Sequence, residues 1–153
     1  AVAGGLEMAL ACDLIVAAED ARVGLPEVKR ALVAAGGGLL RLAQRIPYHV
    51  AAEIALTGEN LSVRRLHEIG LVNRVAEPGH ALPVALELAG QIAENAPLAV
   101  DGSKHILAHA AEWGLARGWD LQADIADRVT TSEDAREGAR AFAERREPRW
   151  TGR

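Results

Sequence analysis

Strand-forming segments nearly vanish from this chain after residue 24, which restricts it to folds whose larger part is helical. Residues 14–17 and 22–24 form two short runs that predict strands, and residues 71–75 predict one more. Only 3% of the 153 residues are aromatic. We therefore expect a core of Ala, Leu, Val and Ile, whose small side chains favour closely packed helices.

Glycine, proline and capping residues divide the helical part of the chain into segments. The expected helices are residues 5–11, 36–46, 48–56, 62–70, 83–95, 97–111, 119–129 and 131–146. Ser62 has the position of an N-cap, and Thr131 with Asp134 has the form of a capping box. A break near residue 80 separates a front segment, 1–80, from a helical segment, 81–153.

Charge and cysteine usage exclude several classes of partner and location. Seventeen basic and 21 acidic residues give a net charge of -4, with both signs mixed along the chain, so nucleic acid is not expected as a partner. Residues 1–18 are apolar, but they lack a basic start and contain Glu7 and Asp13, so we expect neither a secretion signal nor a membrane span. The lone Cys12 excludes an internal disulfide and is expected as a packed core thiol in a reducing, cytoplasmic setting.

Two glutamates in glycine-containing segments are the candidate catalytic residues. Glu7 follows Gly4 and Gly5 at a predicted helix start, where free N–H groups can hold a developing anion. Glu27 follows Pro26, at the end of the segment Val-Gly-Leu-Pro-Glu. Each has a simpler reading, because a glutamate in a first helical turn often only caps the helix, and an acid after proline usually faces water. As a pair, Glu7 and Glu27 could divide the chemistry, so that one acid donates a proton while the other activates water.

Two further clusters were weighed as binding sites. His105 and His109 lie four residues apart, a spacing that suits metal ligands, but no third ligand is indicated, so surface or interface histidines are favoured and no metal is expected. The charged segment 133–149 predicts a solvated amphipathic helix. Its neighbours Phe142 and Trp150 indicate that this tail docks against a phosphate-bearing cofactor or a neighbouring subunit.

The motifs together resemble the enoyl-CoA hydratase/isomerase (crotonase) superfamily. The opening segment Ala-Val-Ala-Gly-Gly-Leu-Glu-Met-Ala-Leu-Ala-Cys-Asp resembles its glycine-rich helix signature, and Val-Gly-Leu-Pro-Glu resembles its second-glutamate segment. Residues 56–58, 70–75 and 137–146 resemble its middle and its closing helix. The resemblance implies an α/β chain that forms the C-terminal part of a crotonase-like ββα spiral fold, followed by a mainly helical oligomerisation region at 81–153.

The resemblance also implies roles for particular residues. The N–H of Gly4 would be a donor of the oxyanion hole for an acyl-CoA thioester, Glu7 would activate water, and Glu27 would protonate the α-carbon. The implied substrate pocket includes Gly5, Pro26, Ala35 and Gly36, and the candidate contacts of CoA are Arg145 and Arg146.

Some positions depart from the family pattern. Ala3 replaces a glycine, and residues 34–35 are Ala-Ala where Pro-Gly is common. The family's N-terminal portion, with its first oxyanion N–H, has no counterpart here.

The expected activity is hydration of a trans-2-enoyl-CoA to a 3-hydroxyacyl-CoA, in the manner of fatty acid β-oxidation. The expected partners are an acyl-CoA substrate and further copies of the chain in a homotrimer or a dimer of trimers, with no membrane. No permanently bound cofactor is expected, since coenzyme A is part of the substrate. Two alternatives stay open: another crotonase-family isomerase or hydrolase, and a non-catalytic helical assembly module.

Overall fold

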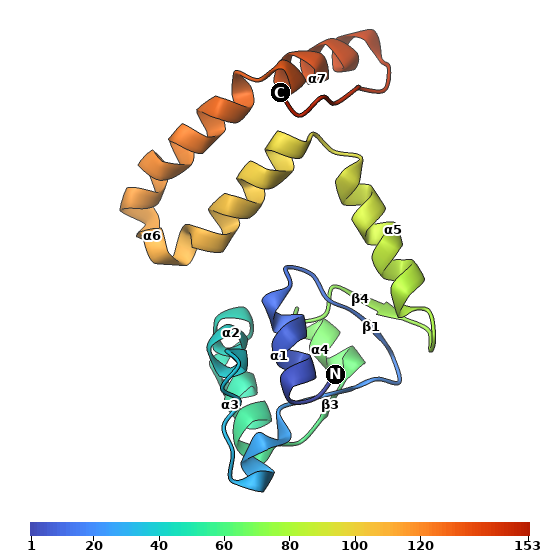
Figure 1. Ribbon diagram of the computed structural model, residues 1–153, viewed down its shortest axis with the longest axis vertical. Helices are drawn as coiled ribbons and strands as arrows, with labels where there is room; N and C mark the ends of the chain where they lie inside the picture. Colours follow the sequence, from blue (N-terminus) through green and yellow to red (C-terminus); the bar gives the residue numbers. More distant parts are fainter. The chain divides into compact units, whose positions relative to one another are not determined.

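Short helices and two small sheets make up Ala1–Glu87, the first of two units in the computed structural model, which describes residues 1–153 (Figure 1). The elements of this unit are α1 (Gly4–Ala11), β1 (Val16–Ala18), β2 (Arg22–Val23), the 3-10 helix η1 (Pro26–Arg30), α2 (Gly38–Arg45), α3 (Tyr48–Thr57), β3 (Leu61–Ser62), α4 (Val63–Glu68) and β4 (Arg74–Ala76). The second unit, Leu88–Arg153, begins inside α5 (Ala81–Ala93) and contains α6 (Pro97–Thr130) and α7 (Glu133–Glu144).

The strands form two separate pairs in the first unit. β1 and β4 are parallel, with Val16 opposite Arg74, and β2 and β3 are antiparallel, with Val23 opposite Leu61. The three strands expected from sequence are therefore present, each shifted by at most a few residues. β3 was missed because it is two residues long and leads directly into α4, whose N-cap is Ser62. As predicted, the Ser62 hydroxyl accepts a hydrogen bond from the Arg65 N–H at 3.2 Å.

The core of the first unit is aliphatic, as the scarcity of aromatic residues predicted. Its largest fully buried side chains are Leu6, Leu10, Leu25, Leu42, Ile54, Leu66 and Val63. Helix α1 packs against α2, and α2 packs against α3. Because Leu6 and Leu10 are four residues apart, they lie on one face of α1 and anchor it in this core.

The expectation for Cys12 was wrong, because its side chain is exposed. Cys12 is the C-cap of α1 and has an extended backbone, so it has left the helical face that carries Leu6 and Leu10. The Cys12 Sγ lies 3.6 Å from the carbonyl oxygen of Met8, a residue that is exposed as well.

Helix α6 replaces the two helices expected at 97–111 and 119–129. α6 spans both segments, but Gly114 has φ 63° and ψ 162°, and this non-helical conformation divides α6 into two limbs (Figure 1). A Cβ added at Gly102 would lie 3.1 Å from Ile125 Cγ2 and 3.2 Å from Val129 Cγ2. The two limbs therefore pack closely against each other at Gly102. None of the helices combines the length and apolar character needed to cross a bilayer.

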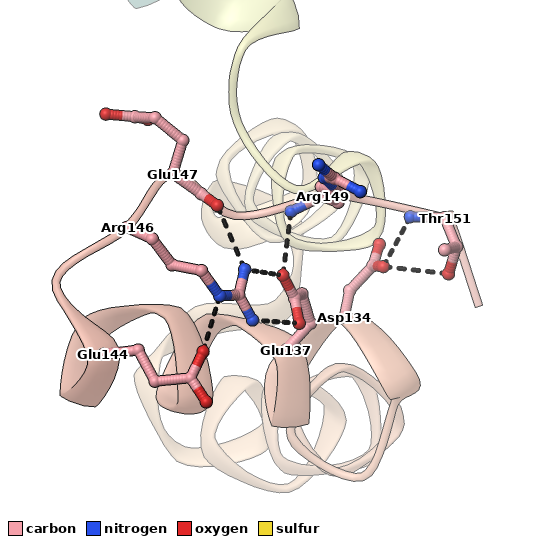
Figure 2. A network of polar contacts seen from close by, with 7 residues as sticks. All are labelled: Asp134, Glu137, Glu144, Arg146, Glu147, Arg149 and Thr151. Carbon is pink, nitrogen blue, oxygen red and sulfur yellow. Dashed lines mark hydrogen bonds and ion pairs between the residues drawn. The ribbon is translucent and has the colours of Figure 1, made fainter.

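The start of α7 differs from the predicted capping box. Ser132, and not Thr131, is the N-cap, and its hydroxyl accepts a hydrogen bond from the Ala135 N–H at 3.0 Å. The Thr131 hydroxyl instead bonds back to the Asp127 carbonyl at 2.8 Å. Asp134 is then free to bind the C-terminal tail, through the Thr151 N–H at 2.7 Å (Figure 2). The Gly152 N–H also donates to Asp134, at 2.9 Å.

Trp150 fixes the same tail within the second unit. Its indole N–H donates to the Glu94 carbonyl at 2.8 Å, and its ring lies so close to Gly138 that an added Cβ would be 3.3 Å away. Trp150 therefore docks on its own chain, and docking of this tail on a cofactor or a neighbouring subunit stays a prediction. Phe142, by contrast, is 88% exposed.

Candidate active site

Glu7 lies in the first turn of α1 and points its carboxylate at the beginning of α2. Its Oε1 accepts a hydrogen bond from the Gly38 N–H at 2.9 Å, although the two residues are 31 positions apart. Gly38 is the first residue of α2, where N–H groups have no partner within the helix and the helix dipole is positive. This helix start therefore holds the Glu7 carboxylate in place. The simple role of capping its own helix does not describe Glu7.

The glycine run 36–38 leaves room for this carboxylate. A Cβ added at Gly36 would lie 2.7 Å from Glu7 Oε2, and one added at Gly38 would lie 2.8 Å from Glu7 Cγ. Both distances are shorter than side chains tolerate, so any other residue here would displace Glu7. Sequence reasoning included Gly36 in the pocket but missed Gly38. The available signal was a glycine inside a helix, which costs stability unless something must approach closely.

Gly4 begins α1 and has an N–H that donates to no oxygen of the chain, whereas the N–H groups of Gly5 and Leu6 donate to the carbonyls of Val2 and Ala3. A Cβ added at Gly4 or Gly5 would meet no atom within 4 Å. Packing within the chain therefore does not require glycine at either position. The Gly4 N–H can donate to a ligand, as an oxyanion hole requires.

Glu27 is the second residue of η1 and is half-buried. Its Oε2 is buried, and no group of the chain donates a hydrogen bond to it. A buried carboxylate oxygen without a donor is costly and uncommon. One oxygen of Glu27 is therefore withdrawn from water, contrary to the simpler of its two readings, and such an unpaired acid is a candidate for chemistry.

The other predicted pocket residues lie beside these groups in the chain. Pro26 is half-buried at the start of η1, Gly5 is exposed in α1, and Ala35 is exposed directly before Gly36. The structure thus joins Glu7 to the glycine run by direct contact. No hydrogen bond connects Glu7 with Glu27 or Gly4, and their separate roles stay predictions.

Arg145 and Arg146 lie in the second unit, where Arg146 is the centre of an ion-pair network (Figure 2). Its Nη1 and Nη2 donate to the two carboxylate oxygens of Glu137 at 2.6 and 3.0 Å, and its Nε donates to Glu144 at 2.6 Å. These bonds lower the pKa of Glu137 from 4.5 to about 2 and raise the pKa of Arg146. The Arg145 side chain is exposed and pairs with no group. Contact of either arginine with CoA stays a prediction.

His105 and His109 form a ladder with Trp113 along one face of α6. The two imidazole rings stack with centroids 4.4 Å apart, and the His109 and Trp113 rings stack at 5.5 Å. His109 Nδ1 lies 2.8 Å from the His105 carbonyl, which can only accept, so Nδ1 carries a proton. No group of three or more His, Cys, Asp or Glu side chains in the chain is arranged to hold a metal ion.

Comparison with known proteins agrees with this geometry. The sequence model of the family "Enoyl-CoA hydratase/isomerase" matches residues 1–153. Among curated proteins, the chain is 40% identical over 157 residues to the carnitinyl-CoA dehydratase of Proteus mirabilis, covering 100% of this chain and 60% of that protein.

Solved structures give the same result. An enoyl-CoA hydratase from Mycobacterium tuberculosis H37Rv superposes with a TM-score of 0.98 at 58% identity, covering 100% of this chain and 61% of that one. The enoyl-CoA hydratase EchA1 from Mycobacterium marinum gives a TM-score of 0.97 at 57% identity, covering 100% of this chain and 63% of that one.

The chain therefore belongs to the enoyl-CoA hydratase/isomerase (crotonase) family and has its α/β fold. It spans about three fifths of the length of the relatives that it matches.

Proposed function

We propose that the protein containing this chain is an enoyl-CoA hydratase that adds water to a trans-2-enoyl-CoA and yields a 3-hydroxyacyl-CoA. The observation that carries the proposal is the Glu7 carboxylate, held by the Gly38 N–H between two glycines that leave no space for a side chain. The buried and unpaired Oε2 of Glu27 supplies a second acid in a different environment. Two such acids can divide proton donation and water activation between them.

Each residue has a defined part in the proposed reaction. Glu7 removes a proton from a water molecule while the oxygen of that water attacks the β-carbon. Glu27 donates a proton to the α-carbon, and H and OH thus add to the same face of the double bond. Between these events, negative charge gathers on the thioester oxygen, where the Gly4 N–H donates a hydrogen bond. One oxyanion donor commonly contributes about 3–4 kcal/mol to transition-state stabilisation. The chemistry uses no permanently bound cofactor, since coenzyme A belongs to the substrate.

Glutamine substitutions test this proposal in the complete encoded protein. Glu7→Gln and Glu27→Gln keep the size of the side chain but remove the base or acid, so crotonyl-CoA hydration should fall by about 100-fold or more in each variant. Glu53→Gln is the matched control, because Glu53 is exposed on α3 and its side chain forms no hydrogen bond or ion pair. Normal hydration by Glu7→Gln would refute the assignment.

A second candidate activity is dehydration, which the 40% identical carnitinyl-CoA dehydratase favours. Hydration and dehydration are one equilibrium catalysed from opposite sides, so the same residues would serve both. Product analysis with crotonyl-CoA, a 3-hydroxyacyl-CoA and carnitinyl-CoA distinguishes the preferred substrate. Double-bond migration or release of free CoA would instead indicate an isomerase or a hydrolase.

We further propose that the helices of 81–153 hold the protein in a cytoplasmic homotrimer or dimer of trimers. Exposed apolar side chains support an assembly role, among them Leu107, Leu115, Trp119 and Phe142. Light scattering of the complete protein measures the assembly. If the protein assembles but shows no turnover of any acyl-CoA, the alternative of a non-catalytic assembly module is favoured.

A further inference from the structure

We infer that Arg41 is a positioning residue, which holds the glycine run 36–38 in the conformation that binds the Glu7 side chain. The inference rests on the proposed function, since it assigns Arg41 to the site in which Glu7 would act. Arg41 lies in the first turn of α2 and is half-buried. Its side chain turns back toward the residues that precede the helix, and its Nη1 donates to the Gly36 carbonyl at 3.1 Å.

The guanidinium also lies against Gly37. A Cβ added at Gly37 would overlap Arg41 Nη1, and Gly37 has φ 92°, which L side chains rarely adopt. Gly37 is therefore glycine because of its backbone conformation, and the Arg41 guanidinium packs against it. Because the peptide bond is planar, a hydrogen bond on the Gly36 carbonyl also fixes the orientation of the Gly37 N–H.

Two residues of the glycine run 36–38, Gly36 and Gly38, lie against Glu7. Gly36 and Gly38 contact its carboxylate and its Cγ, and the Gly38 N–H donates to Oε1. Rotation of the peptide between Gly36 and Gly37 would move the Gly38 N–H and the surface on which the carboxylate lies. Arg41 can thus act on Glu7 through the glycine run without contacting a substrate.

Charge pairing does not explain Arg41. Arg41 forms no ion pair with any carboxylate of the chain. Its hydrogen-bond partner is the neutral carbonyl of Gly36. A hydrogen bond that involves a charged donor is stronger than one between neutral groups. The hydrogen bond from Arg41 can therefore restrict the turn at Gly37, which has a positive φ and could otherwise adopt several conformations.

Arg45 provides a matched control on the same helix. One turn after Arg41, its Nη1 donates to the Cys12 carbonyl at 2.7 Å, so it also joins α2 to a backbone oxygen of a preceding segment. It does not contact the glycine run. Alanine at Arg45 therefore removes a comparable bond that does not involve the glycine run.

The test measures crotonyl-CoA hydration by the complete protein with Arg41→Ala, Arg45→Ala, Glu7→Gln and the Arg41→Ala/Glu7→Gln double variant. We expect Arg41→Ala to lower kcat about 10- to 100-fold, with KM changed less than about threefold, and Arg45→Ala to stay within about twofold of wild type. In the Glu7→Gln background, Arg41→Ala should cost less than about twofold, because residues that act through one group are not additive.

A second measurement is independent of turnover. Amide hydrogen exchange at Gly38 should accelerate in Arg41→Ala but not in Arg45→Ala, while circular dichroism shows that both variants fold. Equal kcat losses in the two arginine variants, or a full Arg41→Ala effect in the Glu7→Gln background, would overturn the inference. Normal turnover by Glu7→Gln would instead refute the proposed function, so the two failures are distinguishable.

Discussion

The Glu7 carboxylate and the Gly38 N–H form a 2.9 Å hydrogen bond that joins the first turn of α1 to the first residue of α2. Both helices are short, at eight residues each, and they are held in place by buried leucines, among them Leu10 and Leu42. The position of the candidate base therefore depends on helix packing as well as on its own helix. Substitution of the glycines beside Glu7 therefore tests whether its position matters for activity.

Gly38→Ala should lower activity without unfolding the protein. Alanine is favoured over glycine within a helix by about 1 kcal/mol, but the new methyl group would lie 2.8 Å from Glu7 Cγ and displace that side chain. We expect kcat for hydration to fall about 10- to 100-fold, while the free energy of unfolding changes by less than about 1 kcal/mol.

Gly90→Ala in α5 is the control for Gly38→Ala. A Cβ at Gly90 meets no atom within 4 Å, so this variant should raise the free energy of unfolding by about 1 kcal/mol and leave kcat unchanged. Urea unfolding and steady-state kinetics measure both quantities. Equal activity of the two variants would show that Glu7 tolerates the added methyl group.

Ala3→Gly should stabilise the protein. Ala3 precedes α1 with φ 51° and ψ −130°, a conformation that strains a residue with a Cβ. Glycine removes the strain, which exceeds its own entropic cost, so the free energy of unfolding should rise by about 1 kcal/mol. Ala11→Gly, at the exposed end of α1, should lower it by a similar amount. Urea unfolding compares the two, and destabilisation by both would show that Ala3 is unstrained.

Local sequence patterns predicted much of the fold because they depend on residues close together in the chain. The Ser62 cap, the strand beginning at Val16 and the helix after Pro97 all follow from such short-range rules. The contact of Glu7 with Gly38 spans 31 positions, so it depends on how α1 and α2 pack, which no local pattern specifies. The exposure of Cys12 has the same origin: the helix was correctly predicted to end at residue 11, but no local pattern specifies which way the chain turns after that end.

Competition between neighbouring polar residues explains the errors at the second unit's helices. Thr131 and Ser132 can both cap a helix, and the Asp127 carbonyl takes the Thr131 hydroxyl, which leaves Ser132 as the cap. The residue pattern indicated Glu27 as one of two catalytic acids, but its role as proton donor to the α-carbon was inferred from family resemblance, as was the contact of Arg145 with CoA. The chemistry of both residues depends on groups that are distant in the sequence, and local patterns do not predict which of these lie close together in the fold.

Acid should release the C-terminal tail through Glu137. The Arg146 guanidinium lowers the pKa of Glu137 from 4.5 to about 2, so the folded state favours the carboxylate. The resulting stabilisation is fully present above pH 4.5 and is lost as the pH falls from about 4.5 to about 2. Asp134, whose pKa is lowered mainly by the Thr151 N–H, adds to the loss in acid.

The amide resonance of Arg149 reports this release, because its N–H donates to Glu137 Oε1 at 3.0 Å. Its chemical shift should titrate with a midpoint near pH 2 in the wild type and lose that step in Glu137→Gln. Glu112→Gln, on α6, should keep the step. An unchanged titration in Glu137→Gln would assign the acid sensitivity to another group.

Gly102→Leu should destabilise the second unit by forcing the two limbs of α6 apart. The Cβ alone would lie 3.1 Å from Ile125 Cγ2, so the rest of a leucine side chain has no space unless one limb moves. Overpacking of this kind commonly costs about 1–3 kcal/mol, which exceeds the gain of about 1 kcal/mol from replacing a helical glycine. Gly90→Leu carries the same change to an open position and should raise the melting temperature slightly. Thermal unfolding followed by circular dichroism separates the variants, and a melting temperature for Gly102→Leu equal to that of Gly90→Leu would show that the limbs are not in close contact at this glycine.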